Sequence, residues 1–182
     1  MMAQMLSLYI PQFHELWYRR QMMEDPATMD YNRGYDLSIP GYHPDTGCID
    51  FPESAWKEWF DRWIHREPEK FYAYIVRKSD GEWLGEVCLH RRGGENAYEI
   101  GIVLEGKYRC MGYASIALEL LLQHAFCQMQ AEAVYNRFES SRKAALRIHR
   151  SAGFVPMRTE NGIPLLCLSK ERYFALHGEE NA

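Results

Sequence analysis

The residues best suited to chemistry lie where an apolar strand passes into a periodic helix, over residues 98–125. This stretch reads YEIGIVLEGKYRCMGYASIALELLLQHA, and its turn carries Arg109, Gly112 and Ala114. The first N–H groups of a helix have no partners within the helix, and small residues let an anion approach them. The spacing Arg-x-x-Gly-x-Ala therefore predicts a turn that binds a phosphate group through its main chain.

Strands and helices along the second half of the chain must position this turn. Apolar runs and an Asp80-Gly81 turn predict strands over 71–77 and 82–90, and a third strand over 97–104 leads into the phosphate turn. A helix is expected over 112–128, because apolar residues recur there with helical spacing. The remaining expected elements are a strand, a helix, two strands joined at Asn161-Gly162 and a short helix or tail, over 131–138, 141–152, 154–158, 163–168 and 169–176.

The first half is expected to supply a strand over 5–10, a helix from Pro11 to about Glu24, and a helix over 51–67. Residues 25–52 carry successive Pro and Gly turn signals and are predicted to form a long loop. A loop of this length inside one domain more often has a function than serves only to connect two elements. The second helix carries an apolar stripe that we assign to the core, formed by Trp56, Trp59, Phe60, Trp63 and Ile64.

Length and composition fit one globular domain of 182 residues, with 47% apolar and 25% charged residues. The net charge of −4 and the lack of a basic patch argue against a nucleic-acid partner. Five scattered cysteines form no C-x-x-C pair, which indicates neither a zinc site nor a disulfide framework. The chain starts without a secretory signal pattern and has no apolar run that could span a bilayer, so we expect a cytoplasmic protein without membrane contact.

Three segments, in this order along the chain, resemble the GNAT superfamily of N-acetyltransferases. A three-strand meander comes first. It runs into EIGIVLEGKYRCMGYAS at 99–115, which looks like the acyl-CoA pyrophosphate loop of that family. AALRIHRSAGF at 144–154 is similar to the helix and Gly-Phe pair near the C-terminus of its members. Together the three cover residues 71–168, a little over half the chain.

The resemblance implies an α/β (α+β) fold with a mixed, mainly antiparallel sheet and helices on both faces, in a single domain over 1–182. Residues 1–70 would form the first strand, the helices and a substrate-side loop. Residues 71–168 would form the cofactor-binding core, and 169–182 the tail. The implied acetyl donor is acetyl-CoA, with no metal.

Eleven residues are implied to bind the coenzyme. Main-chain N–H groups of the turn would hold the pyrophosphate, the strand before it would pair with the pantetheine arm, and a basic residue would reach the phosphates. Cys110 and Met111 depart from the Gly or basic residues that are common there, and Arg142 stands where Asn is common; a solvated basic face is the alternative for Arg142. The full set is Ile102, Val103, Leu104, Arg109, Cys110, Met111, Gly112, Tyr113, Ala114, Ser115 and Arg142.

Two catalytic residues are implied as well. Glu99 occupies the position at which many members carry a general base, and burial among apolar neighbours would raise the pKa of its carboxyl group. A structural carboxylate paired with Lys or Arg is the alternative. His149 stands where the family often has a tyrosine that donates a proton to the coenzyme sulfur, and an imidazole can also donate one. A packed or solvated histidine is the alternative.

The acceptor amine is expected between the meander and the first-half helices. The 25–52 loop offers aromatic and acidic groups that suit a cation, namely Tyr31, Tyr35, Tyr42, His43, Asp30, Asp36, Asp45 and Asp50. The sequence therefore predicts direct acetyl transfer to a primary amine of a small molecule or peptide, in a monomer or a homodimer. A non-catalytic acyl-CoA-binding module of the same fold is the alternative. A different nucleotide-binding α/β protein is disfavoured, because neither G-x-x-x-x-G-K-[ST] nor G-x-G-x-x-G is present.

Overall fold

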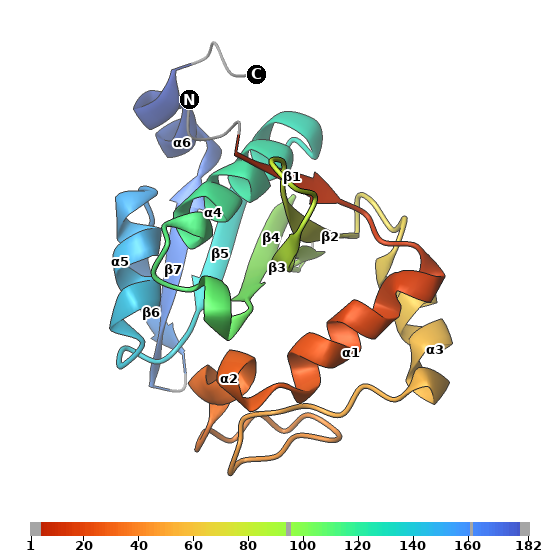
Figure 1. Cartoon of the computed structure of the whole chain (residues 1–182). Coiled ribbons are helices and arrows are strands. Elements are labelled where there is room, and N and C mark those ends of the chain that lie inside the picture. The colour runs from red at the N-terminus through yellow and green to blue at the C-terminus, as the bar shows by residue number, and fades with distance from the viewer. Residues whose placement is uncertain (1–4, 94–95, 161, 179–182) are drawn as a thin grey trace.

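The computed structural model describes residues 5–93, 96–160 and 162–178, which form a seven-stranded sheet covered by helices on both faces (Figure 1). The strand order is β1-β2-β3-β4-β5-β7-β6, and neighbours are antiparallel except for β4 and β5. The predicted mixed, mainly antiparallel sheet is confirmed. Its strands are β1 Leu6–Tyr9, β2 Lys70–Arg77, β3 Trp83–Arg91, β4 Ala97–Leu104, β5 Ala133–Arg137, β6 Val155–Glu160 and β7 Ile163–Ser169.

Side chains of β2 point alternately to the two faces of the sheet, and each face belongs to a separate hydrophobic core. Phe71, Ala73 and Ile75 belong to the core beneath α4 (Tyr113–Gln123), whereas Tyr72 and Tyr74 belong to a second core on the other face. Successive side chains of a strand point to opposite faces of a sheet, so a strand covered on both sides reads as a continuous apolar run. The sheet is therefore the middle of three layers.

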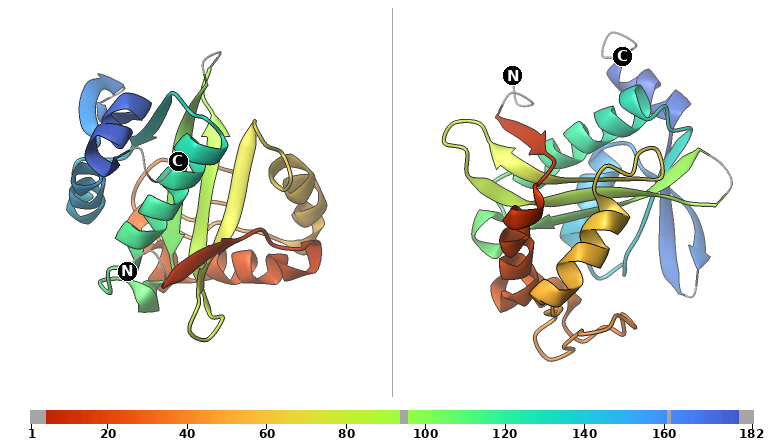
Figure 2. Two further views of the ribbon diagram at one scale, coloured as in Figure 1. Left: turned by 90° about the horizontal axis from the view of Figure 1, so that it is seen from above. Right: turned by 90° about the vertical axis from the view of Figure 1, so that its right-hand side faces the viewer.

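The helices divide between these two layers, and Figure 2 shows α4 on one side of the sheet with α1 and α3 on the other. α5 and α6 pack against the core that α4 covers. Among the described residues, no helix is long and apolar enough to cross a membrane. The other helical elements are η2 Phe13–Glu15, α1 Leu16–Glu24, α2 Pro26–Met29, η3 Asp30–Asn32, α3 Glu53–Trp63, η4 Gly106–Tyr108, η5 His124–Gln128, α5 Lys143–Ser151 and α6 Lys170–His177.

The segment predicted as a loop over 25–52 begins with helical structure instead. Asp25 accepts a hydrogen bond from the Ala27 N–H at 3.1 Å, and Pro26 occupies the first helical position of α2. An Asp-Pro pair serves as a helix start as well as a turn, which is why the sequence signal was ambiguous here. The short η3 follows, and the rest of the segment is irregular apart from a bridge between Tyr42 and Ile49.

Other element bounds differ from the sequence prediction by a few residues. The first helix is preceded by the 3-10 turn η2, because the Glu15 carboxylate accepts from the Gln12 N–H at 2.7 Å and tightens the start. The helix expected over 112–128 changes at His124 into a π-helical turn. The predicted turn residue Asn161 and the last residues of the tail, 179–182, lie outside the described residues.

β4 and β5 separate soon after they meet. Their parallel pairing covers only Ala97, Glu99 and the residue between them, opposite Ala133–Tyr135. Beyond Glu99, β4 continues to Leu104 and pairs with β3 alone. The main-chain groups on the β5 side of β4 are therefore left as an edge inside the sheet, directly before the predicted phosphate turn.

Candidate functional site

The predicted phosphate turn ends on a glycine in the left-handed region. Gly112 is the N-cap of α4 with φ of +83°, where any L side chain is strained. A Cβ added there would meet no atom within 4 Å, so open space lies beside it. No side chain caps α4, which leaves its first N–H groups without a side-chain partner. Uncapped N–H groups beside open space fit an anion such as a pyrophosphate.

The other predicted residues of this turn line the same helix start. Cys110 is exposed and has a positive φ of +62°, and Met111 is 60% exposed. Tyr113 and Ala114 are half-buried in the first turn of α4, where Ser115 is exposed. The structure therefore brings the predicted set together around one helix N-terminus.

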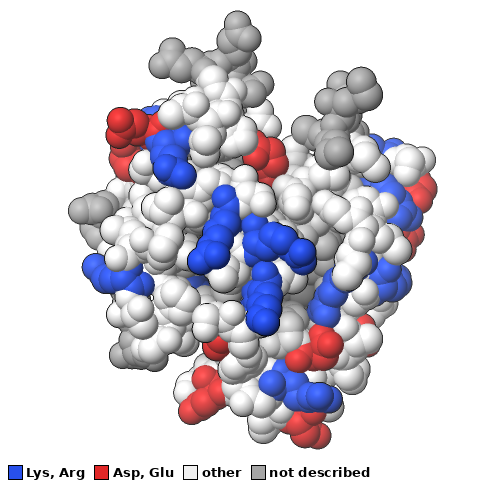
Figure 3. Space-filling model, turned by 90° about the vertical axis from the view of Figure 1, so that its left-hand side faces the viewer, with Lys and Arg blue, Asp and Glu red and all other residues white. Residues whose placement is uncertain are grey.

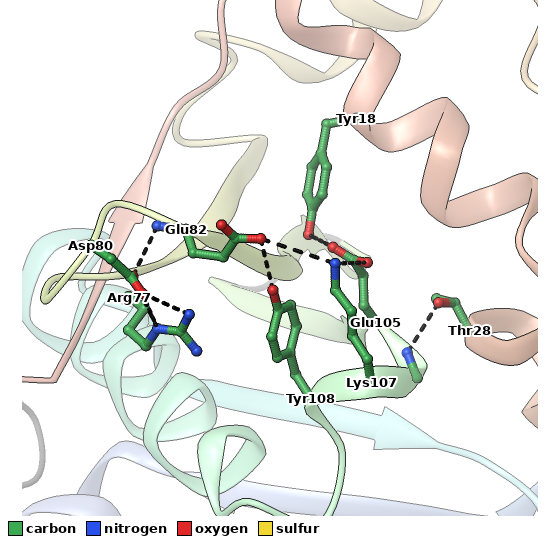
Figure 4. Close-up of polar contacts among 9 residues, drawn as sticks. Tyr18, Thr28, Arg77, Asp80, Glu82, Glu105, Lys107 and Tyr108 are labelled. Atoms are coloured by element: carbon green, nitrogen blue, oxygen red, sulfur yellow. Dashed lines mark hydrogen bonds and ion pairs between the residues drawn. The ribbon is translucent and has the colours of Figure 1, made fainter.

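A polar network holds the strand end that feeds the turn (Figure 4). Glu105 is buried, accepts from the Tyr18 O–H at 2.7 Å and pairs with Lys107 Nζ at 3.1 Å. The Gly106 N–H donates to Thr28 Oγ1 at 3.1 Å. The burial of Tyr18 and its bond to this carboxylate raise the pKa of the Tyr18 phenol, so it stays a donor. The network joins α1 and α2 to the start of the turn.

Close packing explains why a glycine stands at this strand end. A Cβ on Gly106 would lie 2.5 Å from the Ala27 carbonyl oxygen. Because this oxygen belongs to the backbone, no side-chain rotation can relieve the clash, and only glycine fits. On the other side of η4, the Tyr108 O–H donates to Glu82 at 2.7 Å (Figure 4). The turn is thus anchored to α2 and to the β3 end of the sheet.

Arg109 and Arg142, both predicted to reach coenzyme phosphates, converge on one tyrosine ring. The Arg109 guanidinium lies 5.6 Å from the Tyr31 ring centroid, and that of Arg142 lies 5.1 Å from the same centroid. Arg109 also pairs with Asp30 at 2.7 Å, and Arg142 stacks on Tyr35 at 4.8 Å. Desolvation is the main reason that the pKa of Tyr31 is raised to about 12.

Residues 28–35, here called the strap, thereby connect the phosphate turn to the start of α5. The Tyr35 hydroxyl lies 2.8 Å from Ser141 Oγ, and Arg109 donates to the Thr28 carbonyl oxygen. Arg142 also pairs with Glu139 at 2.6 Å. In this structure the two predicted phosphate ligands are therefore held by protein groups of the strap and of the loop before α5.

The predicted pantetheine residues lie on the β4 edge that β5 leaves. Val103 and Leu104 pair with Glu86 and Gly85 of β3, and none of the β4–β5 pairs includes Ile102, Val103 or Leu104. Ile102 and Val103 are half-buried, whereas Leu104 is buried. Because their outer main-chain groups face the side where β5 diverges, an extended arm with amide groups could pair there as an added strand.

Glu99 is a half-buried carboxylate held by two guanidinium groups. Its Oε1 accepts from Arg137 Nε at 3.1 Å, and its Oε2 accepts from Arg92 Nη1 at 3.5 Å. This geometry corresponds to the structural alternative that the sequence left open for Glu99. Its role as general base stays a prediction.

His149 is buried with both ring nitrogens engaged. Nδ1 lies 2.9 Å from the Ala145 carbonyl oxygen, an acceptor, so Nδ1 carries the proton and donates it. Nε2 then accepts from the Asn136 amide at 2.8 Å. The rings of Phe138 and Phe154 pack around the imidazole, and burial lowers its pKa. This geometry corresponds to the packed histidine that the sequence left open as the alternative, and the acid role of His149 stays a prediction.

A buried ion pair that sequence reasoning missed lies on the α1 side of the sheet. Arg19 of α1 bonds Glu86 of β3, which also accepts from the Tyr72 O–H. The guanidinium stacks on Trp59 at 4.6 Å and on Phe51 at 5.2 Å. Glu86 in an otherwise apolar strand was a sequence signal for a buried cation, but several arginines could have supplied it.

The predicted acceptor residues of the 25–52 segment are mostly engaged with one another. The Tyr42 O–H donates to the Asn32 and Tyr35 carbonyl oxygens, and His43 lies 2.8 Å from Asp50. With Tyr31, Tyr35 and Asp30 bound to the two arginines, these side chains hold the segment together. The structure therefore brings part of the predicted set to the coenzyme side and the rest into local pairs.

Comparisons with known proteins agree with this geometry. A family model described as an acetyltransferase (GNAT) domain matches residues 10–155. The uncharacterized N-acetyltransferase YnaD of Bacillus subtilis (strain 168) is 30% identical over 118 residues, which are 62% of this chain and 66% of that relative, just under two thirds of its length.

Two solved structures share the fold. The spermidine N-acetyltransferase of Vibrio cholerae in complex with CoA and spermine superposes with a TM-score of 0.73 at 14% identity, over 94% of this chain and 99% of that one. An acetyltransferase (GNAT family) of Bacillus anthracis superposes with a TM-score of 0.68 at 17% identity, over 92% and 96% of the two chains. The match of the family model over most of the chain, together with the separated β4 edge and the glycine-capped helix, shows that this chain belongs to the GNAT family of acetyltransferases.

Proposed function

We propose that the chain is an N-acetyltransferase that moves an acetyl group from acetyl-CoA directly to a primary amine. The observation that carries this proposal is the continuous path from the separated edge of β4 to the uncapped, glycine-led start of α4. An acyl-CoA needs these two features in this order, a main-chain edge for its amide arm and an anion site for its pyrophosphate. Membership of the family supports it.

In this proposal the residues of the turn hold the coenzyme through main-chain N–H groups. Gly112 leaves the approach open, and Ser115 adds a hydroxyl donor. Acetyl-CoA supplies an activated acetyl group, and the protein positions it against the acceptor. Ile102, Val103 and Leu104 pair with its amide arm.

Exposed cations near the start of α5 suit the remaining phosphate of the coenzyme. Lys143, Arg147 and Arg150 are exposed on α5, one or two helical turns apart. Figure 3 shows Lys and Arg side chains gathered on the face of the molecule that carries α5. Arg142 begins this helix and would join them while stacked on the Tyr31 ring, since a stacked guanidinium still has N–H groups to donate to a phosphate.

A small cationic amine is the acceptor class that we favour. The solved Vibrio cholerae relative is named for spermidine, and its structure holds spermine. Asp36 and Asp45, two exposed carboxylates of the 25–52 segment, suit such a cation. Spermidine is therefore the first acceptor to test, followed by aminoglycosides, amino-acid derivatives and peptide N-termini.

One observation favours a second candidate, a non-catalytic acyl-CoA-binding module. The two predicted catalytic groups, Glu99 and His149, are both engaged by protein partners. A module that only binds the coenzyme would need the turn and the β4 edge but no group that accepts or donates a proton.

Calorimetry with acetyl-CoA, run beside thermal unfolding with CoA and dephospho-CoA, tests the proposal. We expect micromolar binding, stabilisation by CoA and a smaller effect of dephospho-CoA, because it lacks the phosphate that the α5 cations would hold. Release of free thiol during incubation with spermidine separates the enzyme from the binding module. The absence of acetyl-CoA binding by the intact chain would contradict both candidates.

A further inference from the structure

His90 lies in the candidate site, although neither its sequence context nor the family resemblance singled it out. It stands on β3 directly opposite Glu99 of β4 in the antiparallel register. The pairs Cys88–Gly101 and Glu86–Val103 follow along the two strands. Residues directly opposite one another share a face, so the His90 and Glu99 side chains lie on the same side of the sheet, about 5 Å apart at Cβ.

This face is the one that α1 and α3 cover. Cys88 lies two residues before His90 on β3, and Val103 lies four residues after Glu99 on β4, so all four side chains share one face of the sheet. Cys88 and Val103 pack against the core that these helices cover. His90 itself meets the Trp63 ring of α3 edge-on at 6.2 Å between ring centroids. The acceptor amine is expected on this side, so His90 faces the acceptor rather than the coenzyme helix α4.

One ring nitrogen of His90 makes no hydrogen bond with the described residues. This nitrogen, Nδ1, is buried. Burying a polar atom without a partner costs stability, so such an atom requires an explanation. By contrast, the Glu99 carboxylate opposite accepts bonds on both of its oxygens.

Burial and the surrounding cations favour the neutral, basic form of this imidazole. Burial is the main cause of its lowered pKa. Glu99 on β4 raises the pKa, while Lys70 on β2, Arg137 on β5 and Arg92 lower it. Trp63, the contact from α3, is uncharged. In the tautomer that carries its proton on Nε2, a neutral imidazole has its lone pair on Nδ1 and accepts a proton there.

The pairing of β4 with β5 ends beside His90 and Glu99. β4 and β5 separate immediately after Glu99, and the next β4 residue on the acceptor face is Gly101, which has no side chain. Opposite it, burial raises the pKa of Cys88 to about 12, so this thiol is neutral and adds no charge. A Cβ on Gly101 would lie 2.9 Å from Cys88 Sγ, so this sulfur packs over Gly101, and Glu99 is the last β4 residue paired with β5 before the two strands separate.

We propose that His90 is the catalytic residue that takes the proton from the acceptor ammonium, with Glu99 and its two arginines as the charged surroundings that position it. This inference rests on the proposed function, since it assigns a residue to that reaction. His90 Nδ1 is buried in the unliganded protein, so its lone pair takes one proton from R–NH3⁺, directly or through one water, when binding of the acceptor exposes it. The amine nitrogen then forms the C–N bond to the acetyl carbon as the C–S bond breaks. The second amine proton passes to the sulfur, and His90 returns its proton to solvent, which balances the reaction.

The test compares His90→Gln with Glu99→Gln and with His14→Gln, an exposed histidine on the 3-10 turn η2. We expect His90→Gln to lower kcat for spermidine, or for the best acceptor found, by about 100-fold or more. Its KM for acetyl-CoA and its thermal unfolding should stay close to those of wild type. The acidic limb of the wild-type pH profile, with a midpoint below the ordinary histidine value of about 6.5, should disappear. His14→Gln should behave as wild type.

NMR titration of the intact wild-type chain gives a measurement that does not depend on turnover. In NMR titrations, the imidazole signal that is absent from His90→Gln identifies His90. We expect this signal to titrate below the ordinary histidine range and to shift when spermidine is added to the CoA complex. A His90 signal that titrates normally and ignores spermidine would overturn the proposal.

The failures of the two proposals are distinguishable. If wild type binds acetyl-CoA and acetylates amines, but His90→Gln keeps its kcat within about twofold and retains the acidic limb, His90 is not the base. In that case a large loss in Glu99→Gln alone would assign the role to Glu99. If wild type does not bind acetyl-CoA, the proposed function fails, and the assignment of His90 fails with it.

Discussion

At the scale of single residues, the candidate site depends on one backbone conformation. Gly112 leads α4 at φ of +83°, and Gly81 in the β2–β3 turn has a φ of +74° with equally open surroundings. The two positions thus share the same conformational strain for any side chain, but only Gly112 borders the predicted anion site. This makes Gly81 a matched control for the coenzyme loop.

We predict that Gly112→Ala weakens acetyl-CoA binding about tenfold or more, because the methyl group meets the phosphate and the strained backbone shifts the N–H groups. Both Gly112→Ala and Gly81→Ala should cost about 1 kcal/mol of unfolding free energy. Calorimetry and urea unfolding measure the two effects separately. Equal acetyl-CoA affinity in the two variants would contradict the assignment of the turn at Gly112 as the coenzyme-binding loop.

The buried imidazole of His149 makes stability depend on pH. Its pKa is lowered in the folded state by burial, so the unfolded chain binds this proton more readily. Stability is therefore complete above the unfolded value of about 6.5 and falls as the pH drops through and below it. We predict that His149→Phe reduces the loss of unfolding free energy between neutral pH and pH of about 5, measured by urea unfolding at each pH.

The same variant tests the acid role. A group that donates a proton to the leaving sulfur would make His149→Phe lower turnover more than acetyl-CoA affinity. Unchanged turnover, together with a changed pH dependence of stability, would leave His149 a packed core residue.

At the scale of elements, the strap of residues 28–35 connects the turn before α4 to the loop before α5. Tyr31 lies between the guanidinium groups of Arg109 and Arg142, so it orients two cations that come from separate elements. We predict that Tyr31→Leu weakens acetyl-CoA binding by about threefold to tenfold, since each stacked cation contributes about 0.5–1 kcal/mol. Tyr31→Phe keeps the ring and should bind like wild type.

Amide hydrogen exchange of residues 28–35 provides an independent measurement on this strap. Tyr31→Leu should exchange faster there, and Tyr31→Phe should not. Equal exchange and equal affinity in all three proteins would show that the strap does not organise the coenzyme site.

At the scale of the whole molecule, a buried ion pair joins the N-terminal layer to the sheet. Arg19 of α1 and Glu86 of β3 are 17% and 10% exposed at their side chains, and aromatic rings enclose the guanidinium. Removing one partner leaves the other charge buried without compensation. The pair therefore attaches α1 to this face of the sheet.

We predict that Glu86→Gln costs about 3–5 kcal/mol of unfolding free energy, and that adding Arg19→Met restores a large part of it. Glu24→Gln is the control, since Glu24 pairs with Arg20 at 3.0 Å on the exposed side of the same helix, and such a pair contributes about 0.5 kcal/mol or less. Urea unfolding of the three variants and of wild type measures these differences. A loss in Glu86→Gln no larger than in Glu24→Gln would contradict the structural role of the buried pair.

The sequence by itself determined the order of strands and helices, the mainly antiparallel sheet and the turn at Gly112. These features follow from local physics, because a positive φ demands glycine, and apolar periods of two and of about 3.6 distinguish strands from helices. The helical nature of residues 26–29 escaped prediction, since Asp25-Pro26 starts either a turn or a helix.

Only the tertiary structure decided which charged groups meet. Glu99 pairs with Arg137, which is 38 residues away in the sequence, and Glu86 pairs with Arg19, which is 67 residues away. Likewise, the neutral state of His149 and the unused nitrogen of His90 depend on neighbours from other elements. Local sequence signals carry no information about such pairs, because several arginines could serve each carboxylate and burial selects among them. The family and the glycine-led turn before α4 were thus readable in the chain, whereas the protonation states of its candidate catalytic groups follow from packing.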